Sequence, residues 1–217
     1  MRVSMPTAAL PVALHDDNAT VEQPAVAEVS NQEQGASNLG YVLALAALHG
    51  MGVTGPGADD VARAVVLELL AGEDLTARVL IPREDAVRLF GEEAASADIP
   101  GLVVLDFLQE VVTELEVEIV RRTGQRTDAG VPADLSWLFV VASPGAAGER
   151  LNRIIEGGME DLILGVFLDA WPYGITCTVD GSGVIVGLEG RSAPPWTGRR
   201  LLTCGRPDAA QRLRFDH

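Results

Sequence analysis

The chain has 217 residues, of which 47% are hydrophobic and 22% charged, so it can bury the core of one sizeable domain. Its 31 acidic and 16 basic residues give a net charge of −15, which opposes binding to nucleic-acid phosphates. The longest apolar run, Tyr41–Val53, is shorter than a membrane helix requires and is interrupted by His49 and two glycines. We therefore expect a soluble, cytoplasmic domain without a membrane span.

The basic residues are all arginines, and the three histidines and two cysteines are scattered along the chain. No metal-ligand spacing exists among them, so we predict no metal site and no cofactor. Cys177 and Cys204 fall in predicted strands and could be neighbours. In a cytoplasmic protein, two buried free thiols are favoured over a disulfide between them.

Residues 1–37 are acidic and polar and contain three prolines, which predicts a poorly ordered leader or an edge strand. The main domain is expected to span residues 38–205. Its first segment, Tyr41–Leu48, is apolar throughout, so periodicity does not separate a strand from a helix. The place of this segment before a glycine-rich turn favours a buried strand, whereas its leucine and alanine content favours a helix.

The glycine-rich turn, Gly52–Asp59, has the glycines of the phosphate-binding loop G-x-x-x-x-G-K-[ST]. The lysine that reaches the phosphates is replaced by Ala58, and the hydroxyl residue that holds magnesium is replaced by Asp59. Acidic side chains at the start of the following helix also repel phosphates. The turn is therefore either a plain strand–helix connection or a degenerate, inactive nucleotide site. The residues of that candidate site are Gly52, Gly55, Gly57, Ala58 and Asp59.

After the turn, apolar residues at helical spacing predict a helix that ends at Ala71, and strands then alternate with helices. The predicted strands are Thr76–Ile81, Gly101–Leu105, Trp137–Ala142 and Leu162–Phe167, and the predicted helices are Glu84–Phe90, Leu108–Arg122 and Glu149–Glu156. This alternation predicts an α/β fold with a mostly parallel sheet flanked by helices.

Residues 173–205 are predicted to form an antiparallel extension at the edge of the sheet. Ile175–Val179 and Val184–Leu188 flank the sequence Asp-Gly-Ser-Gly, which is a strong hairpin signal. Arg200–Cys204 is expected to be a last strand, and residues 206–217 a tail. Six arginines fall late in the chain, and a partner-contact or solvated face is favoured over a basic patch. They are Arg191, Arg199, Arg200, Arg206, Arg212 and Arg214.

From about residue 40 to residue 172 the chain resembles the motor domain of FtsK/HerA-type P-loop ATPases. The glycine-rich turn is similar to the start of their Walker A motif. Leu115–Arg122 resembles the long helix before their Walker B motif, and Leu138–Ser143 falls at the Walker B strand. The resemblance implies a P-loop-NTPase-like sheet. The departures all remove chemistry, because the Walker B acidic pair is also absent and is replaced by Ala142-Ser143.

Degenerate domains of this type occur in large actinobacterial membrane proteins that carry a LysM module and a SARP-like bacterial transcriptional activator domain. The turns Gly55–Ala58, Ala170–Pro172 and Asp180–Gly183 resemble theirs. The resemblance implies that the chain is such a domain standing alone, or a piece of a longer protein that is tethered to a membrane.

These features predict a non-catalytic, pseudo-ATPase-like module that acts as a scaffold or as a protein-interaction or regulatory domain, without catalytic residues. Its partners are expected to be proteins, and a homo-oligomer stays open. One alternative is a nucleotide-binding or weakly hydrolytic domain with Asp59 as a metal ligand. A second is a DNA-associated transcriptional regulator whose Arg199 and Arg200 contact phosphates. A hydrolase has no support, because Ser143 lacks the nucleophile-elbow pattern and the histidines have no predicted partner.

Overall fold

The computed structural model describes residues 38–47, 49–72, 77–125, 135–156, 160–191 and 193–215. The predicted leader at residues 1–37 lies outside these ranges. The compact unit that contains the described residues runs from Ala36 to His217. Within the described ranges, no helix is both long enough and apolar enough to cross a membrane.

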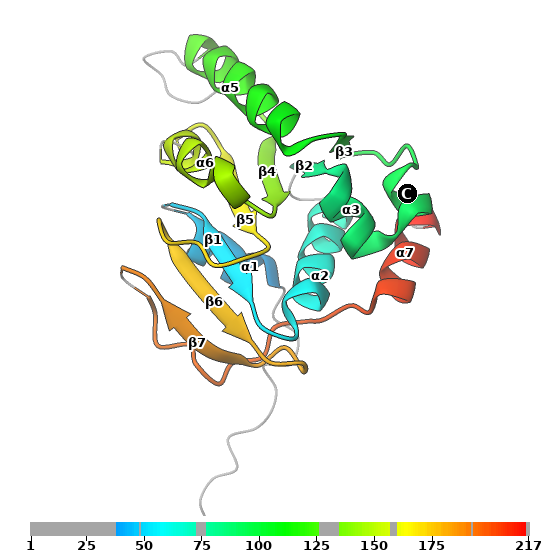
Figure 1. The fold of residues 1–217 in the computed structure, drawn as a ribbon, viewed down its shortest axis with the longest axis vertical. Helices are drawn as coiled ribbons and strands as arrows, with labels where there is room; N and C mark the ends of the chain where they lie inside the picture. Colours follow the sequence, from blue (N-terminus) through cyan, green and yellow to red (C-terminus); the bar gives the residue numbers. More distant parts are fainter. Residues whose placement is uncertain are drawn as a thin grey trace, which may run out of the picture. The chain divides into compact units, whose positions relative to one another are not determined.

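A seven-stranded sheet forms the centre of the unit, in the order β3-β2-β4-β5-β1-β6-β7 (Figure 1). All pairings are parallel except that of β6 with β7, which is antiparallel. The strands are β1 (Met51–Thr54), β2 (Ala77–Pro82), β3 (Leu102–Leu105), β4 (Trp137–Ala142), β5 (Ile163–Phe167), β6 (Ile175–Val179) and β7 (Ile185–Glu189). The predicted α/β fold with a mostly parallel sheet is confirmed.

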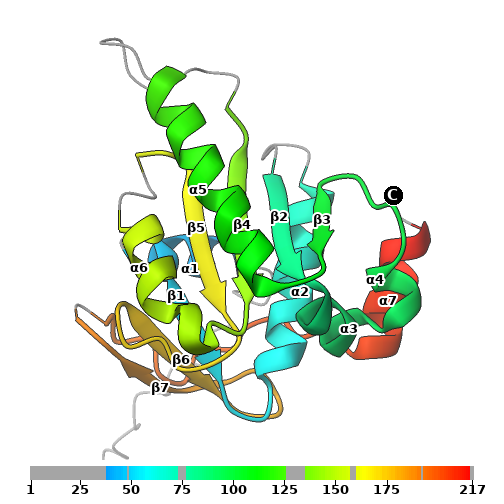
Figure 2. The same cartoon turned by 45° about the horizontal axis from the view of Figure 1, so that its top comes forward.

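Helices cover both faces of the sheet (Figure 2). They are α1 (Asn38–Ala46), α2 (Ala58–Ala71), α3 (Arg83–Phe90), α4 (Glu92–Ala95), α5 (Leu108–Gln125), α6 (Gly148–Ile155) and α7 (Arg206–Phe215), with a 3₁₀ turn at Gly145–Ala147. Alternate residues of each central strand point to opposite faces, so β4 sends Phe139 and Val141 to one core and Leu138 and Val140 to the other. One core lies under α1, α2, α3, α4 and α7, and the other lies under α5 and α6.

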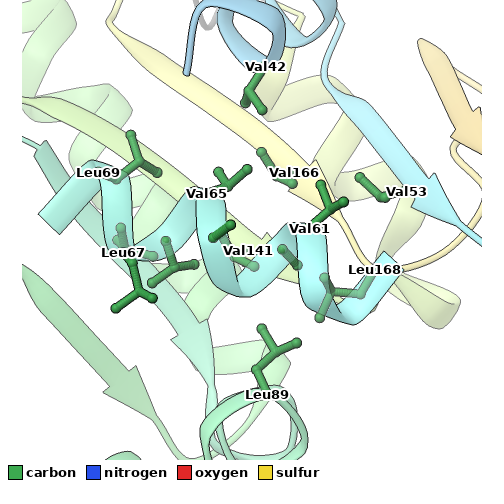
Figure 3. Packing of buried hydrophobic residues seen from close by; sticks show 14 of the residues in the cluster. Val42, Val53, Val61, Val65, Leu67, Leu69, Leu89, Val141, Val166 and Leu168 are labelled. Carbon is green, nitrogen blue, oxygen red and sulfur yellow. The ribbon is translucent and has the colours of Figure 1, made fainter. Parts of the chain in front are cut away.

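Helix α2 is the centre of the larger core. Its predicted apolar stripe is buried, and Val61 and Val65 lie over the sheet near Val141 and Val166 (Figure 3). Both faces of the sheet are covered, which explains why the strands read as nearly continuous apolar runs rather than as alternating ones.

The segment Tyr41–Leu48, for which strand and helix were both open, contributes to helix α1. Of the two open alternatives the helix is the one observed, and the strand before the turn is β1, which includes Gly52. Val42 and Leu45 of α1 are buried against the sheet, whereas Ala44 is exposed. An all-apolar segment of this length fits one helix face against the core as well as it fits a buried strand.

The predicted C-terminal antiparallel hairpin is confirmed, because β6 pairs antiparallel with β7, and β6 also joins the main sheet by pairing in parallel with β1. Two other predictions for the C-terminal part were wrong. Arg200–Cys204 forms no strand, although Arg200 makes an isolated bridge with Val184. The predicted tail contains helix α7, which buries Ala209 and Leu213 against the core on the α2 side.

An unusually short connection joins β5 to β6 across β1. Parallel strands usually need a crossover of a dozen or more residues, but here residues 168–174 suffice. They pass directly over β1, where a Cβ atom on Gly52 would collide with the Asp169 carbonyl oxygen. Trp171 covers this crossing, since its ring stacks on Phe167 at 3.7 Å between centroids and its Nε1 donates to the His49 carbonyl at 2.6 Å.

Candidate functional site

The predicted nucleotide site lies at the carboxyl edge of the sheet, where ligands of open α/β folds usually bind. Gly52 belongs to strand β1, Gly55 and Gly57 belong to the turn, and Ala58 and Asp59 begin helix α2. The structure thus places the turn between a central strand and a helix N-terminus, as the sequence predicts.

The glycines of this turn are required by the chain's own packing. Gly55 has φ +93°, and a Cβ atom there would collide with the carbonyl oxygen of Val179. A Cβ atom on Gly57 would collide with the carbonyl oxygen of Asp180. The end of strand β6 therefore occupies the space that these glycines leave, and phosphate binding is not needed to explain them.

Position 58, where a phosphate-binding loop has its lysine, faces the protein interior. Ala58 is 5% exposed and belongs to the core on the α2 side. A charged side chain here would have to leave that core or lose its hydration, which is costly without a partner.

Asp59, at the position of the metal-holding hydroxyl, is held by an arginine. Its two carboxylate oxygens accept from Arg88 Nη2 at 2.7 Å and Arg88 Nε at 3.2 Å. This bidentate geometry is the one that a guanidinium makes best with a carboxylate. The neighbouring Asp60 pairs with Arg63, whose Nε also donates to the Cys204 carbonyl at 2.7 Å. Burial lowers the pKa of Arg63 from its usual value.

The end of strand β4 is tied to the same arginine. Ser143 donates to the Asp85 carboxylate through its backbone N–H at 2.8 Å and through its Oγ at 2.6 Å. Arg88 Nη1 in turn donates to Ser143 Oγ at 3.3 Å. Asp85 is only 4% exposed, so its carboxylate oxygens need these hydrogen bonds in place of water. We call Asp59, Asp85, Arg88 and Ser143 the carboxyl-edge cluster.

The carboxyl-edge cluster links the first turn of α2, helix α3 and the end of β4. Sequence reasoning singled out Asp59 and the loss of acidic residues at Ser143, but it missed Asp85 and Arg88. Their one sequence signal is the i, i+3 spacing on a helix that follows a buried strand. That spacing shows that the two side chains share a helix face, but not that this face meets the end of a strand 58 residues away along the chain.

The chemistry open to this cluster is limited. Its hydroxyl and carboxylates bind one another and the guanidinium, and among the residues whose positions are described no histidine lies in the cluster to activate Ser143 as a nucleophile. No group of three or more metal-binding side chains was found in the portion of the chain that the structure describes.

A second cluster of charges lies at the opposite, amino edge of the sheet. Glu118 of α5 accepts from Arg121 Nη2 at 2.6 Å and from Arg122 Nε at 2.7 Å, and these hydrogen bonds lower the pKa of Glu118 to about 2. Arg122 is 1% exposed and donates to the carbonyl of Asp161 at 2.6 Å, just before β5. Within the described residues, its Nη2 has no hydrogen-bond partner. This cluster anchors α5 to the sheet.

The late arginines do not form a single basic surface. Arg191, Arg199 and Arg200 lie beside β7, whereas Arg206 and Arg214 lie on α7. Several are used within the protein. Arg199 Nη1 donates to the Tyr41 hydroxyl, Arg200 Nη1 to the Ser182 carbonyl, Arg206 Nη2 to the Val87 carbonyl and Arg214 Nη1 to Glu93.

Both cysteines are free thiols, as favoured from the sequence. Cys177 is buried in strand β6, where burial raises its pKa to about 11, so it is a poor nucleophile near neutral pH. Cys204 lies in the segment before α7, which has no regular secondary structure, and not in a strand as predicted.

Comparisons with family models, with curated proteins and with solved structures find no match to this chain.

Proposed function

We propose that this domain is a non-catalytic module in which a loop of the phosphate-binding type has a structural role and connects a central strand to a helix. The observation that carries the proposal is the carboxyl-edge cluster. Arg88 binds the carboxylate of Asp59, which stands at the metal-ligand position of the loop. Arg88 also donates to Ser143, at the end of strand β4. An internal cation and two internal carboxylates thus take the interactions that a triphosphate and a metal ion would need.

The arrangement of the sheet supports kinship with P-loop ATPases of the FtsK/HerA type as part of this proposal. A phosphate loop and a metal-holding strand end must lie at one edge of a sheet. Here the turn after β1 and the end of β4 do so, with only β5 between the two strands. The groups that would bind phosphate are missing. Position 58 is apolar, and the end of strand β6 occupies the space beside the glycines.

The proposal is tested by titrating the protein with ATP and GTP in the presence of magnesium, using calorimetry for binding and phosphate release for hydrolysis. We expect no saturable binding at millimolar nucleotide and no turnover above the blank. Turnover that disappears in the Asp59→Asn variant, and persists in the exposed control Asp106→Asn, would overturn the proposal.

A module without catalysis would act by binding other proteins. Helix α5 offers a surface for such contacts. Its outward side carries Val117, 59% exposed, and Val120, 73% exposed, and Phe107 before it is 68% exposed. Large exposed apolar side chains that gather on one element often mark a contact surface. We expect the double variant Val117→Ser/Val120→Ser to lose partners that the wild-type domain captures by cross-linking in cell extract. The control Thr113→Ser on the same helix should retain them.

A further inference from the structure

A cavity of about 790 Å³ opens at the amino edge of the sheet, away from the carboxyl-edge cluster. It lies where helices α1 and α6 end and where β6 begins and β7 ends. Its volume is in the range of small-molecule sites, which are mostly apolar with a few polar groups that orient the ligand. Nothing in the proposed function uses this cavity.

The floor of the cavity is built from three glycines that hold separate chain segments together. A Cβ atom on Gly174 would collide with the Gly50 carbonyl oxygen, and one on Gly190 would collide with the Gly174 carbonyl oxygen. The Ile175 N–H donates to the Gly50 carbonyl at 3.4 Å. These close backbone contacts hold the glycine floor of the cavity in place.

Two aromatic side chains in the walls are also held in place. Tyr173, which is 40% exposed, packs edge-on against Trp171 with 5.0 Å between ring centroids. Trp196 packs edge-on against Tyr41 at 5.3 Å. Both Tyr173 and Trp196 line the cavity, and fixed aromatic surfaces favour a flat apolar ligand, because little side-chain freedom is lost on binding.

Opposite charges lie in different walls. Asn152 lies in α6 and Glu156 directly follows that helix, whereas Arg191 follows β7. Helix α6 contacts β5, and β1 and β6 separate β5 from β7 in the sheet, so the two charges belong to different sides of the cavity. Both charged side chains are solvent-exposed, which leaves them able to bind a ligand without an interior burial cost.

We propose that this cavity binds a small zwitterionic molecule with a flat apolar body, whose carboxylate pairs with Arg191 and whose amine pairs with Glu156. A guanidinium is suited to a carboxylate because it can donate two parallel hydrogen bonds. The carboxylate of Glu156 and the amide oxygen of Asn152 accept from an amine. The body of the ligand lies on the glycine floor between the aromatic walls.

Four related probes separate these contributions: indole, indole-3-acetate, tryptamine and L-tryptophan. All four contain the same flat ring system. In the order given, they carry no charged group, a carboxylate, an amine, and both a carboxylate and an amine. Calorimetry gives each affinity, and ¹⁵N NMR locates the site through the amide signals of Gly50, Gly174 and Gly190. We expect L-tryptophan to bind most tightly and to shift these three amides.

The variants Arg191→Gln and Glu156→Gln identify the two charge contacts. Arg191→Gln should weaken L-tryptophan and indole-3-acetate about ten-fold and leave tryptamine unchanged. Glu156→Gln should weaken L-tryptophan and tryptamine similarly and spare indole-3-acetate. The exposed residues Arg153 and Glu149 do not line the cavity, so Arg153→Gln and Glu149→Gln serve as matched controls.

The proposal fails if none of the four probes binds saturably, or if the shifted amides lie elsewhere. It also fails if indole binds as tightly as L-tryptophan, or if each variant weakens all probes equally. All four variants change exposed side chains, and unchanged melting temperatures confirm that the fold is kept.

Discussion

At the carboxyl ends of β1 and β4, side chains of the protein hydrogen-bond to one another. At the amino ends of β1 and β6, the protein has an open cavity instead. Glycines are central to both edges. At the carboxyl edge Gly55 and Gly57 admit the end of β6 and close the surface. At the amino edge Gly174 and Gly190 draw backbones together beneath an open space. The same residue type therefore marks a closed edge and an open one, and only the neighbouring segments tell them apart.

The charges follow a different division. The amino edge is anchored by a buried pair, Glu118–Arg122, with side-chain exposures of 7% and 1%. The outer pair of the carboxyl edge, Asp59–Arg88, has exposures of 33% and 43%. Removing one partner of a buried pair leaves an uncompensated charge, whereas an exposed pair is screened by water. Stability should therefore depend more on charge at the open edge than at the closed one.

The largest effect is expected from Glu118→Gln, which leaves the buried Arg122 guanidinium without its carboxylate. We expect a loss of about 3–4 kcal/mol in the free energy of unfolding, measured by urea denaturation. The control Glu116→Gln, two residues before Glu118, removes an exposed pair with Arg150 and should leave the free energy of unfolding nearly unchanged. If the two variants lost equal free energy of unfolding, the buried pair would not be more important for stability than an exposed pair.

The same residue predicts a pH dependence. The pKa of Glu118 is about 2 in the folded protein, below its ordinary value of 4.5. A carboxyl group with a lowered folded pKa stabilises the protein above its unfolded pKa, and this stability is lost as the pH falls from about 4.5 toward 2. Urea titrations at pH 6, 4 and 3 should therefore show a decline in wild type that is smaller in Glu118→Gln.

Gly57→Ala tests whether packing closes the carboxyl edge. Its Cβ would collide with the Asp180 carbonyl oxygen, and we expect a loss of about 2–3 kcal/mol by thermal unfolding. Gly124→Ala in α5 is the control, since a Cβ atom there meets nothing within 4 Å, and it should be neutral or slightly stabilising. A fully stable Gly57→Ala protein would show that the turn and β6 are not in close contact.

Asp85→Asn should have a smaller effect. The amide oxygen of asparagine replaces only one of the two acceptors that bind Ser143, so one buried hydrogen bond is lost. We expect a cost of about 1–2 kcal/mol in urea denaturation. Asp106→Asn makes the same chemical change at an exposed residue that pairs with Arg83 and should be near neutral.

The smallest effect is expected from Arg88→Gln, which removes the exposed pair with Asp59. A cost of about 0–1 kcal/mol is expected, shrinking further in concentrated salt. A cost above about 2 kcal/mol would mean that Arg88 is as important to its edge as the buried pair is to the other.

The sequence predicts the parts of the fold in which local pattern and burial agree. The apolar runs of β4 and β5 and the hairpin around Asp180–Gly183 lie where they were expected. Tyr41–Leu48 was ambiguous because it is apolar on all sides. Helix α7 was missed because, among its residues whose side chains are described, the buried apolar ones are Ala209 and Leu213, too few for a periodic signal.

The sequence predicted where the candidate site lies but not which residues contact it. The turn Gly52–Asp59 is recognisable from its glycine spacing alone. The partners that fill it, Asp180 and Arg88, are distant along the chain and come together only through strand order and the placement of α3. The cavity at the other edge draws on four separate segments, so no local pattern announces it.

The short connection over β1 has a consequence for the order in which the protein assembles during translation. Strand β1 is made early, yet both of its neighbours, β5 and β6, are made in the last third of the described chain, and residues 168–174 must close over Gly52. Contacts that span such long stretches of sequence slow folding. Strand β1 can therefore pair with its neighbours only after β5 and β6 have been translated, and a chain cut off after β5 would leave one side of β1 unpaired, as an exposed strand edge that invites aggregation.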